Sequence, residues 1–466
     1  MRKDTKPKDF YTGQEISIDD IRSTVRFQAV KILNRYERSA SYLDKLLQAA
    51  FSQYDMTALN RSLLTEIVYG CVRWKAKLDW ILNGFFHGDY NKCINPVKNA
   101  MRIGLYQILF LDKIPDHAAI NESVEIVKRL QSQKTAGLVN GVLRGIARNI
   151  KNIRYPSETQ DKLFYLGVIY SFQRFMVERW EKRLGEEETI KLIDTLNTRP
   201  GTAVRINYLK SRTKEENEAI MSAVVGEKGE YRTAPMHGTY YVSGAGDITS
   251  KPEFKDGTIT MQDPSSAMVC KLAAPKEGSY VVDMCAAPGG KTSLMGEMMN
   301  NKGKITAYDI FEAKLDQISA NAERMGITIV TAEAADTRKA KIKGEPDLIL
   351  IDAPCSGTGT IPKHPEIKWS VEPDSFRKLV QTQRDILKNA AKQIKVGGVI
   401  VYSTCSMEKE ENEDNIEWFL SENKGFELDP ATNYLDTVYC HNGYLKTWPH
   451  RHLIMGAFGA RLIRKS

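Results

Sequence analysis

Two cysteines in this chain directly follow apolar, β-branched runs, where a thiol can take part in chemistry. Cys405 lies in "VIVYSTCSMEKEEN" (399–412), and Cys355 lies in "LILIDAPCSGTG" (348–359). A thiol becomes a strong nucleophile once it is ionised. The alternative for each residue is a buried, small hydrophobic side chain, which is the usual environment of a free cysteine.

A glycine turn in "DMCAAPGGKT" (283–292) is a second candidate for chemistry. Gly289 and Gly290 let the backbone approach a ligand closely, and the helix that follows offers free N–H groups. The turn matches neither GxGxxG nor GxxxxGK[ST], which disfavours a dinucleotide or a triphosphate. Asp309, at the end of the next apolar run, is an acid suited to ribose hydroxyls. The pattern indicates a nucleoside ligand without a pyrophosphate, namely S-adenosylmethionine; a tight turn without a ligand is the alternative.

These residues lie at the ends of predicted strands in the C-terminal half of the chain. From about residue 257 onward, apolar strands alternate with helices, which predicts a parallel sheet that is buried on both faces. The predicted strands are 279–284, 304–309, 328–333, 347–352 and 398–403. Because ligands bind beyond the carboxyl ends of such strands, the glycine turn, several carboxylates and both thiols are expected along one edge.

The N-terminal part of the chain shows helical rather than strand periodicity. In "RSLLTEIVYGCVRW" (61–74), apolar side chains recur at helical spacing, and the pattern returns in "NAMRIGLYQILFLD". Residues 20–150 are therefore predicted to form a small all-helical domain. Residues 155–245 mix helix and strand patterns and are predicted to form an α+β connector, to which the sequence gives no function.

Composition limits the class of protein. The chain has 466 residues, of which 42% are hydrophobic, so packed cores in two or three domains are expected. No apolar run is long enough for a membrane span, and the N-terminus lacks the apolar core of a secretory signal. The seven cysteines form no CxxC pair and no zinc spacing. We therefore expect a cytoplasmic protein with free thiols, without a metal and without a membrane partner.

The net charge of +8 is concentrated in one region. Residues 1–150 contain 23 Lys and Arg against 15 Asp and Glu, whereas the remainder is neutral. A basic module next to a balanced one suggests a polyanionic partner, most simply nucleic acid. A helical domain that is merely basic explains the charge equally well.

Longer motifs resemble two known families. "LTEIVYGCVRW", "RIGLYQILFLDKIPDHAAINESVEIVK" and "GLVNGVLR" resemble the NusB-like RNA-binding domain. "MQDPSSAM", "DMCAAPGGKTS", "IDAPCSGTGTIPKHPEIKW" and "VYSTCSMEKEEN" resemble the Sun-type (RsmB-like) RNA cytosine-5 methyltransferases. In combination, the chain is similar to the bacterial enzymes that methylate small-subunit (16S) ribosomal RNA.

The resemblance implies a multidomain architecture. An all-α NusB-like domain (20–150) and the α+β connector (155–245) would precede an α/β, Rossmann-like class I methyltransferase domain (250–466). The implied cofactor is S-adenosylmethionine, the implied partner is ribosomal RNA, and we expect a monomer. Two other functions stay open: the same chemistry on tRNA, and a non-catalytic RNA-binding factor.

The family pattern also implies residue roles. Cys405 would attack carbon 6 of cytosine, Cys355 would assist product release, and Asp352 would face the reacting base. Asp309 would hold the ribose, and Asp336 would lie near the adenine. The full set implied for the cofactor is Cys285, Ala286, Ala287, Pro288, Gly289, Gly290, Lys291, Asp309, Asp336 and Asp352.

Alternatives stay open at several of these positions. The dipeptide Pro354-Cys355 resembles the attacking Pro-Cys of DNA cytosine methyltransferases, so Cys355 competes for the role of nucleophile. Asp352 is otherwise a cap or turn residue. Ser406 is a possible N-cap of a helix whose positive end would favour a thiolate, although an acidic run, Glu408 to Glu413, would oppose one. Lys363, His364, Lys368 and Trp369 either contact RNA or form a solvated loop that Trp369 anchors.

Overall fold

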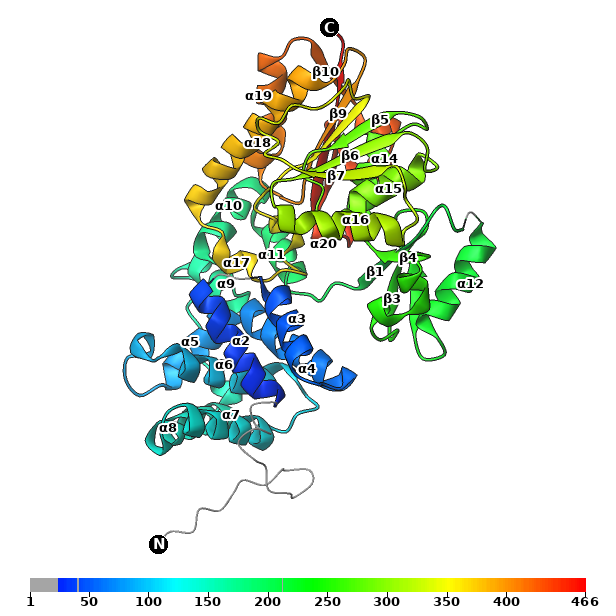
Figure 1. Cartoon of the computed structure of the whole chain (residues 1–466). Coiled ribbons are helices and arrows are strands. Elements are labelled where there is room, and N and C mark those ends of the chain that lie inside the picture. The colour runs from blue at the N-terminus through cyan, green and yellow to red at the C-terminus, as the bar shows by residue number, and fades with distance from the viewer. Residues whose placement is uncertain (1–23, 40–41, 212) are drawn as a thin grey trace. The chain divides into compact units, whose positions relative to one another are not determined.

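The chain folds into two compact units (Figure 1). The computed structural model describes residues 24–39, 42–211 and 213–466. Unit 1 contains the described residues up to Asn197 together with His364–Ser370, and unit 2 contains Thr198–Lys363 and Val371–Ser466. The stretch 155–245, predicted as one connector, contributes its first helices to unit 1 and its strands to unit 2.

Within the described residues, the regular structure of unit 1 is helical, as predicted for the N-terminal domain. Its α-helices are α2 (Val25–Ser39), α3 (Leu43–Gln53), α4 (Ala58–Arg73), α5 (Lys75–Phe85), α6 (Asn95–Phe110), α7 (Asp116–Leu130), α8 (Gln133–Arg148), α9 (Lys162–Ile169), α10 (Arg174–Leu184), α11 (Glu186–Thr195) and α17 (Ile367–Ser370). The central helix is α6, which packs against α2, α4, α7 and α8. Gly104 permits the close approach of α6 and α8, because a Cβ there would lie 2.7 Å from Leu143 Cδ1 on α8.

Unit 2 is built on a nine-stranded sheet. Its strands are β5 (Tyr280–Asp283), β6 (Lys304–Asp309), β7 (Val330–Ala334), β8 (Leu348–Asp352), β9 (Val399–Thr404), β10 (Phe426–Asp429), β11 (Cys440–His441), β12 (Tyr444–Thr447) and β13 (Ala457–Arg464). The order β7-β6-β5-β8-β9 is parallel throughout, and all five predicted strands are confirmed in it.

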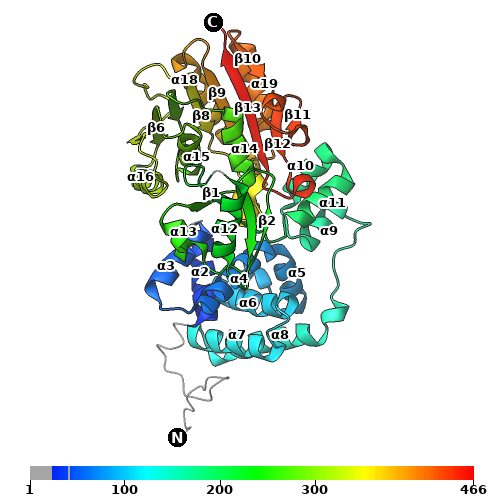
Figure 2. The same ribbon diagram turned by 90° about the vertical axis from the view of Figure 1, so that its right-hand side faces the viewer.

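The sheet is mixed, however, rather than purely parallel as predicted. β13 pairs antiparallel with β9, and β12 and β10 pair antiparallel with β13 (Figure 2). The long strand β13 interrupts its apolar run with Gly459 and Arg461, so its sequence lacks the continuous β-branched pattern of the inner strands. The sheet therefore extends past β9, and the end of β9 lies inside the sheet instead of at its margin.

Helices cover both faces of the large sheet. On one face, α14 (Pro264–Ala273) and α15 (Gly290–Met298) pack with strand residues such as Val281 and Leu350. On the other face, α18 (Pro373–Gln393) and α19 (Glu413–Glu422) pack with Ile349 and Tyr402. Each strand alternates its apolar side chains between two cores, which explains the near-continuous hydrophobic runs.

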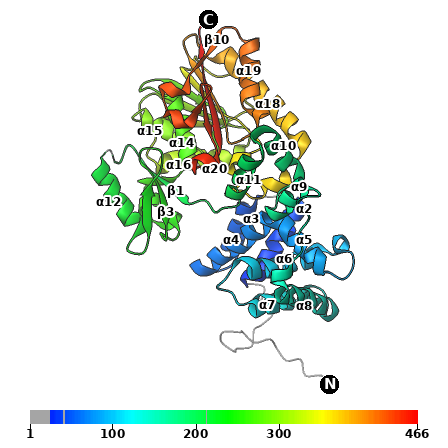
Figure 3. The ribbon, with the colours of Figure 1, turned by 180° about the vertical axis from the view of Figure 1, so that it is seen from behind.

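A smaller four-stranded sheet precedes the large one in unit 2. It contains β1 (Thr202–Ile206), β2 (Glu230–Thr233), β3 (Thr239–Ser243) and β4 (Ile259–Met261), in the order β2-β3-β1-β4. Helix α12 (Lys214–Val225) contributes Met221 and Val224 to its core (Figure 3). The buried side chain of Arg205 on β1 forms an ion pair with Glu297 on α15, which fixes the small sheet to the larger one.

Candidate active site

The thiols of Cys355 and Cys405 meet beyond the carboxyl ends of two neighbouring strands. β8 and β9 pair in parallel with Asp352 opposite Ser403, so the loops that follow leave the sheet side by side. The two Sγ atoms lie 3.3 Å apart, and both thiols are free and half-buried. The strands are neighbours, which was the condition for both sulfurs to reach one substrate ring.

The contact between the thiols separates their acidities. The hydrogen bond lowers the pKa of Cys405 and raises the pKa of Cys355, so the structure favours a Cys405 thiolate that accepts from the Cys355 thiol. Burial and the carboxylates of Asp352 and Glu411 oppose the charge on Cys405, whereas the ammonium of Lys291 favours it. The two sulfurs are therefore placed so that the Cys355 thiol can donate a hydrogen bond to a thiolate at Cys405.

Asp352 is held by the two elements next to it. Lys291 Nζ, in the first turn of α15, donates to Asp352 Oδ2 at 2.6 Å, and Ser403 Oγ donates to Oδ1 at 2.8 Å. Burial opposes the charge on Lys291, but the Asp352 carboxylate outweighs it and raises the pKa of the ammonium. The ion pair connects the glycine turn to the strand that leads to Cys355.

The turn 284–289 brings the backbone close to the edge of the sheet. Gly289 has φ of +99°, and a Cβ there would lie 3.2 Å from the Cα of Ile318, so glycine suits both the conformation and the space. The turn contains a cis Ala287-Pro288 bond. At the start of α15, Thr292 Oγ1 donates to Asp283 Oδ2 at 2.7 Å. These contacts fix the start of the helix beside β5.

A cavity of about 410 Å³ opens next to this turn. Of the ten residues predicted to bind the cofactor, five line the cavity: Cys285, Ala287, Asp309, Asp336 and Asp352. The other five do not line the cavity: Ala286, Pro288 and Gly289 belong to the turn, and Gly290 and Lys291 begin α15. Its carboxylates come from the ends of three strands, as the parallel topology requires.

The carboxylates in this cavity differ in their surroundings. Asp309 Oδ1 accepts the backbone N–H of Phe311 at 3.0 Å. Asp336 is bound by the guanidinium of Arg338 through two hydrogen bonds of 2.9 and 2.8 Å, which lower the pKa of the acid. Asp309 therefore has an oxygen, Oδ2, for which no bond within the described residues is seen, whereas both oxygens of Asp336 are occupied.

Several cavity residues escaped the sequence analysis. Ile310 and Phe311 line the cavity directly after Asp309, and they remain 55% and 59% exposed. Two exposed apolar side chains behind a strand-end acid suit a flat aromatic ring above a sugar. The pair "IF" after "AYD" was a signal in the sequence, because a solvated turn rarely needs two large apolar residues.

A nucleoside cofactor fits these features. Asp309 can accept from ribose hydroxyls, and Ile310 and Phe311 offer an apolar wall. The volume lies in the usual range for small-ligand pockets, about 300–1,000 Å³. In the described parts of the chain, no group of three or more His, Cys, Asp or Glu is placed to hold a metal ion.

The prediction that Ser406 caps a helix is wrong. The helix α19 begins only at Glu413, and a short 3-10 helix, η6 (Lys409–Glu411), intervenes. Cys405 therefore does not lie at a helix N-terminus, and its thiolate gains nothing from a helix dipole. The predicted opposition from the acidic run is seen for Glu411, which lies near both thiols.

The prediction of RNA contacts by Lys368 and Trp369 is also wrong. Lys368 is fully buried in unit 1, where its ammonium donates to Arg73 O, Ser171 O and Asn197 Oδ1. Burial lowers its pKa well below the usual value. Trp369 Nε1 donates to the carbonyl of Val72 at 2.7 Å. Lys368 is therefore neither an RNA ligand nor a solvated side chain, and Trp369 is anchored on the helices. Lys363 pairs with Asp263 Oδ2 at 3.1 Å, and both Lys363 and His364 stay partly exposed.

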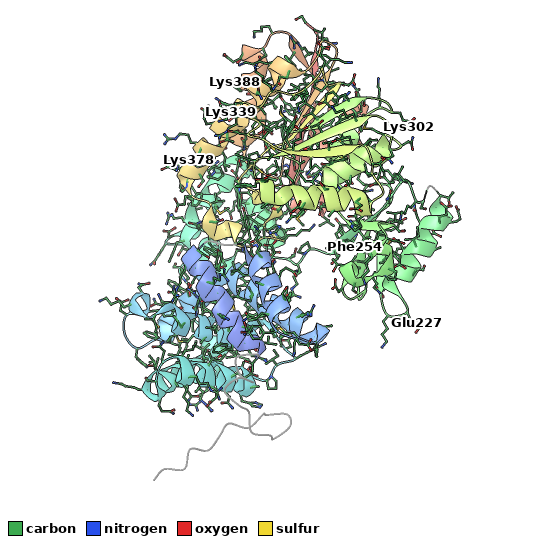
Figure 4. The ribbon with its side chains drawn as sticks, viewed as in Figure 1. Glu227, Phe254, Lys302, Lys339, Lys378 and Lys388 are labelled. Carbon is green, nitrogen blue, oxygen red and sulfur yellow. The ribbon has the colours of Figure 1, made fainter. Side chains whose placement is uncertain are left out.

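Basic side chains remain on the outside of unit 2. Lys378 and Lys388 lie on the outer side of α18 (Figure 4).

In the part of the chain that the structure describes, no helix combines the length and the apolarity of a membrane span.

Comparison with known proteins agrees with this architecture. Residues 270–463 match the model of the family described as 16S rRNA methyltransferase RsmB/F, and residues 23–148 match the NusB family. The chain is 35% identical to the probable ribosomal RNA small subunit methyltransferase B of Bacillus subtilis (strain 168), over 88% of this chain and 90% of that protein.

Two further comparisons extend over most of the chain. It is 31% identical to ribosomal RNA small subunit methyltransferase B of Escherichia coli (strain K12), over 86% of this chain and 90% of that protein. The crystal structure of PH0851 superposes with a TM-score of 0.80 at 29% identity, over 96% of this chain and all of that one. The chain therefore belongs to the RsmB/F family of 16S rRNA methyltransferases, with a NusB-family region ahead of the methyltransferase region.

Proposed function

We propose that this protein transfers a methyl group from S-adenosylmethionine to carbon 5 of a cytosine in small-subunit ribosomal RNA, with Cys405 as a covalent nucleophile. The observation that carries the proposal is the pair of thiols 3.3 Å apart beside the cavity that contains Asp309. Methylation of ribosomal RNA follows from the family, whereas carbon 5 follows from the need for a nucleophile that activates an aromatic ring.

Carbon 5 of cytosine is a weak nucleophile in the intact ring. The Cys405 thiolate would add to carbon 6, which breaks the ring's aromaticity and makes carbon 5 an enamine-type carbon. S-adenosylmethionine supplies a methyl group on a sulfonium, which that carbon can attack. Water would then remove the carbon 5 proton, the C5=C6 bond would re-form, and the C6–S bond would break to release the thiolate. The protonated Cys355 suits this last step, because it donates a hydrogen bond to the departing sulfur.

Asp352 would orient the base. Its oxygens accept from Lys291 and Ser403 but keep further lone pairs, which can accept from the exocyclic amino group of cytosine. Lys291 would hold this carboxylate in position. The cytosine must leave its helix or be presented unpaired, because the ring has to reach a thiol at the edge of a sheet.

The cofactor would lie in the cavity that Cys285, Asp309 and Asp336 line. Asp309 would accept from the ribose hydroxyls. We expect Asp309→Ala to weaken S-adenosylmethionine binding about tenfold, measured by calorimetry, since it removes a charge-assisted hydrogen bond. Asp316→Ala, an exposed acid on α16 (Leu315–Arg324), is the matched control and should bind normally.

The RNA would gain general affinity from the basic N-terminal region. All of the chain's net charge of +8 lies within residues 1–150. Binding through phosphates releases counterions, so affinity for ribosomal RNA should fall steeply between 50 and 200 mM salt.

The central test uses small-subunit ribosomal RNA that contains 5-fluorocytosine. Fluorine at carbon 5 cannot leave as a proton does, so the adduct is trapped after methyl transfer. Mass spectrometry of the digested complex should locate the RNA on Cys405. Cys405→Ser should form no complex, and Cys440→Ser, at a cysteine outside the site, should behave as the natural protein. A crosslink at Cys355 would overturn the assigned roles, and preferred labelling of tRNA would overturn the assigned substrate.

A further inference from the structure

Glu411 is a buried carboxylate that contacts the residues following both thiols. It lies at the end of η6, and its side chain is fully enclosed. It accepts from the backbone N–H of Ser356 at 2.9 Å and from the hydroxyls of Ser356 and Ser406 at 2.5 Å each. Gln383 Nε2, from α18, donates to the same carboxylate at 3.0 Å. Four hydrogen bonds thus converge on one side chain directly behind the thiol pair.

A carboxylate in this position is costly. Burying a charge costs several kcal/mol unless it is well hydrogen-bonded. Burial raises the pKa of Glu411, and the hydrogen bonds from Ser356 and Ser406 offset this only in part. The charge also disfavours a thiolate at Cys405. A neutral side chain would avoid both penalties, so a carboxylate at this position must be needed for the contacts that it makes.

The two thiol-bearing turns depend on Glu411 to different degrees. The turn at Cys405 has anchors of its own next to the thiol: Asn412 Nδ2 donates to Ser406 O at 2.9 Å, and Ser406 N donates to Thr404 Oγ1 at 3.2 Å. At the other turn, both bonds donated by Ser356 end on Glu411.

The residue before Cys355 is linked to the same carboxylate, whereas the flanks of the loop are held by Ala353 N, which donates to Ser403 O at 2.8 Å, and Gly359 N, which donates to Cys405 O at 2.9 Å. Gln383 Nε2 donates to the carbonyl of Pro354 at 2.9 Å as well as to Glu411. Asn415 in turn donates to the Gln383 side-chain oxygen at 2.8 Å, which orients the amide. Loss of Glu411 would therefore free Cys355 more than Cys405.

We infer that Glu411 is a positioning residue for the release step, because it holds the Cys355 thiol against the sulfur that leaves carbon 6. The inference rests on the proposed function. During release the C6–S bond breaks, the electron pair stays on Cys405, and the carbon 5 proton goes to water. The Cys355 thiol stabilises the new thiolate by a hydrogen bond, which requires that its turn stays fixed while the RNA adduct occupies the site.

The test is the amount of covalent RNA–protein complex formed with natural, cytosine-containing ribosomal RNA and S-adenosylmethionine. Glu411→Gln should accumulate this complex on denaturing gels roughly tenfold over the natural protein, with a similar fall in turnover. The Michaelis constant for RNA should change little. A variant that is merely misfolded would form less complex, so accumulation separates positioning from a loss of structure.

Further variants separate the role of Glu411 from the role of Cys355. Cys355→Ala should accumulate the complex at least as strongly, and Ser356→Ala, which removes one of the four bonds, should do so more weakly. Glu417→Gln, an exposed acid on α19, is the charge-matched control and should behave normally. If Cys355→Ala accumulates complex and both Glu411→Gln and Ser356→Ala do not, the inference fails while the proposed function stands. If Cys355→Ala accumulates none and 5-fluorocytosine gives no adduct, the proposed function fails too.

Discussion

Lys291 Nζ lies 2.6 Å from Asp352 Oδ2, and this contact joins the first turn of α15 to the end of β8. The lysine follows the glycine turn, whereas the acid precedes the loop that carries Cys355. The ammonium also lies close enough to Cys405 to favour its thiolate. One side chain thus links the turn beside the cavity, the acid that would face the base, and the proposed nucleophile Cys405.

Removal of this cation should raise the pKa of Cys405. Lys291→Met leaves Asp352, Glu411 and Cys355 as the groups that face the thiol, and both carboxylates oppose a thiolate. The rate of adduct formation with 5-fluorocytosine RNA should fall about tenfold at pH 7, and its pH profile should shift by about one unit toward higher pH. Lys302→Met, which changes an exposed lysine, is the control. An unchanged profile would show that Lys291 does not act on the sulfur.

The thiol pair should be sensitive to oxidation. Hydrogen peroxide can take two electrons from Cys355 and Cys405, form one S–S bond and leave two molecules of water. Methyltransferase activity should fall to below about a tenth and should return after treatment with dithiothreitol. Peptide mapping should identify the Cys355–Cys405 link. In Cys355→Ala the loss should not be reversed in this way, since Cys405 would have no neighbouring thiol; a disulfide to another cysteine would contradict the assignment.

Stability should depend on pH through Asp283. Burial raises its pKa to about 7, although the Thr292 hydroxyl donates to it. Between about pH 4 and pH 7, Asp283 keeps a proton in the folded state that it has lost in the unfolded state. The stabilisation that this proton gives is complete below about pH 4 and is lost as the pH rises through 7. Asp283→Asn stays neutral at every pH and should gain about 3 kcal/mol relative to the natural protein between pH 5 and pH 8.

Urea unfolding of the natural protein and of Asp283→Asn at several pH values measures this difference. Asp316→Asn, at an exposed position, should run parallel to the natural protein. Parallel curves for Asp283→Asn as well would mean that Asp283 is ionised in the folded state.

Lys368 should contribute to the stability of unit 1. Lys368→Met leaves the carbonyls of Arg73 and Ser171 and the amide oxygen of Asn197 without this donor, which costs more than the buried charge that is removed. We expect a loss of about 2 kcal/mol in the free energy of unfolding. Differential scanning calorimetry should show the shift, and Lys378→Met, at an exposed lysine, should show none. A stabilised Lys368→Met would mean that the charge is the larger penalty.

The large sheet and the thiol pair were predictable because local patterns encode them. Runs such as "LILID" are buried on both faces and therefore remain apolar at every position. Parallel strands end at one edge, so the sequence placed Asp352 and Cys405 on the same edge, whereas the adjacency of β8 and β9 came only from the structure. The antiparallel strands were missed since β13 contains Gly459 and Arg461, and the guanidinium is buried only because Asp429 and two backbone carbonyls accept from it.

The site details that failed depend on packing between distant segments. "SMEKEEN" contains three glutamates within four residues, and nothing local distinguishes the buried Glu411 from the more accessible Glu410. Lys368 looked like an RNA ligand because an isolated lysine is normally solvated. Its burial requires oxygens contributed by three helical segments that lie far away in the sequence.

The segment His364–Ser370 has a consequence for synthesis on the ribosome. Unit 1 includes these residues, yet the helices that receive them end at Asn197. Translation must add roughly 170 more residues before Lys368 and Trp369 exist, a delay on the order of 10 to 30 s at typical elongation rates. During that interval the interior of unit 1 lacks the side chains of Lys368 and Trp369. A gene cut after Asn197 would produce an N-terminal half whose missing piece is encoded entirely in the other half.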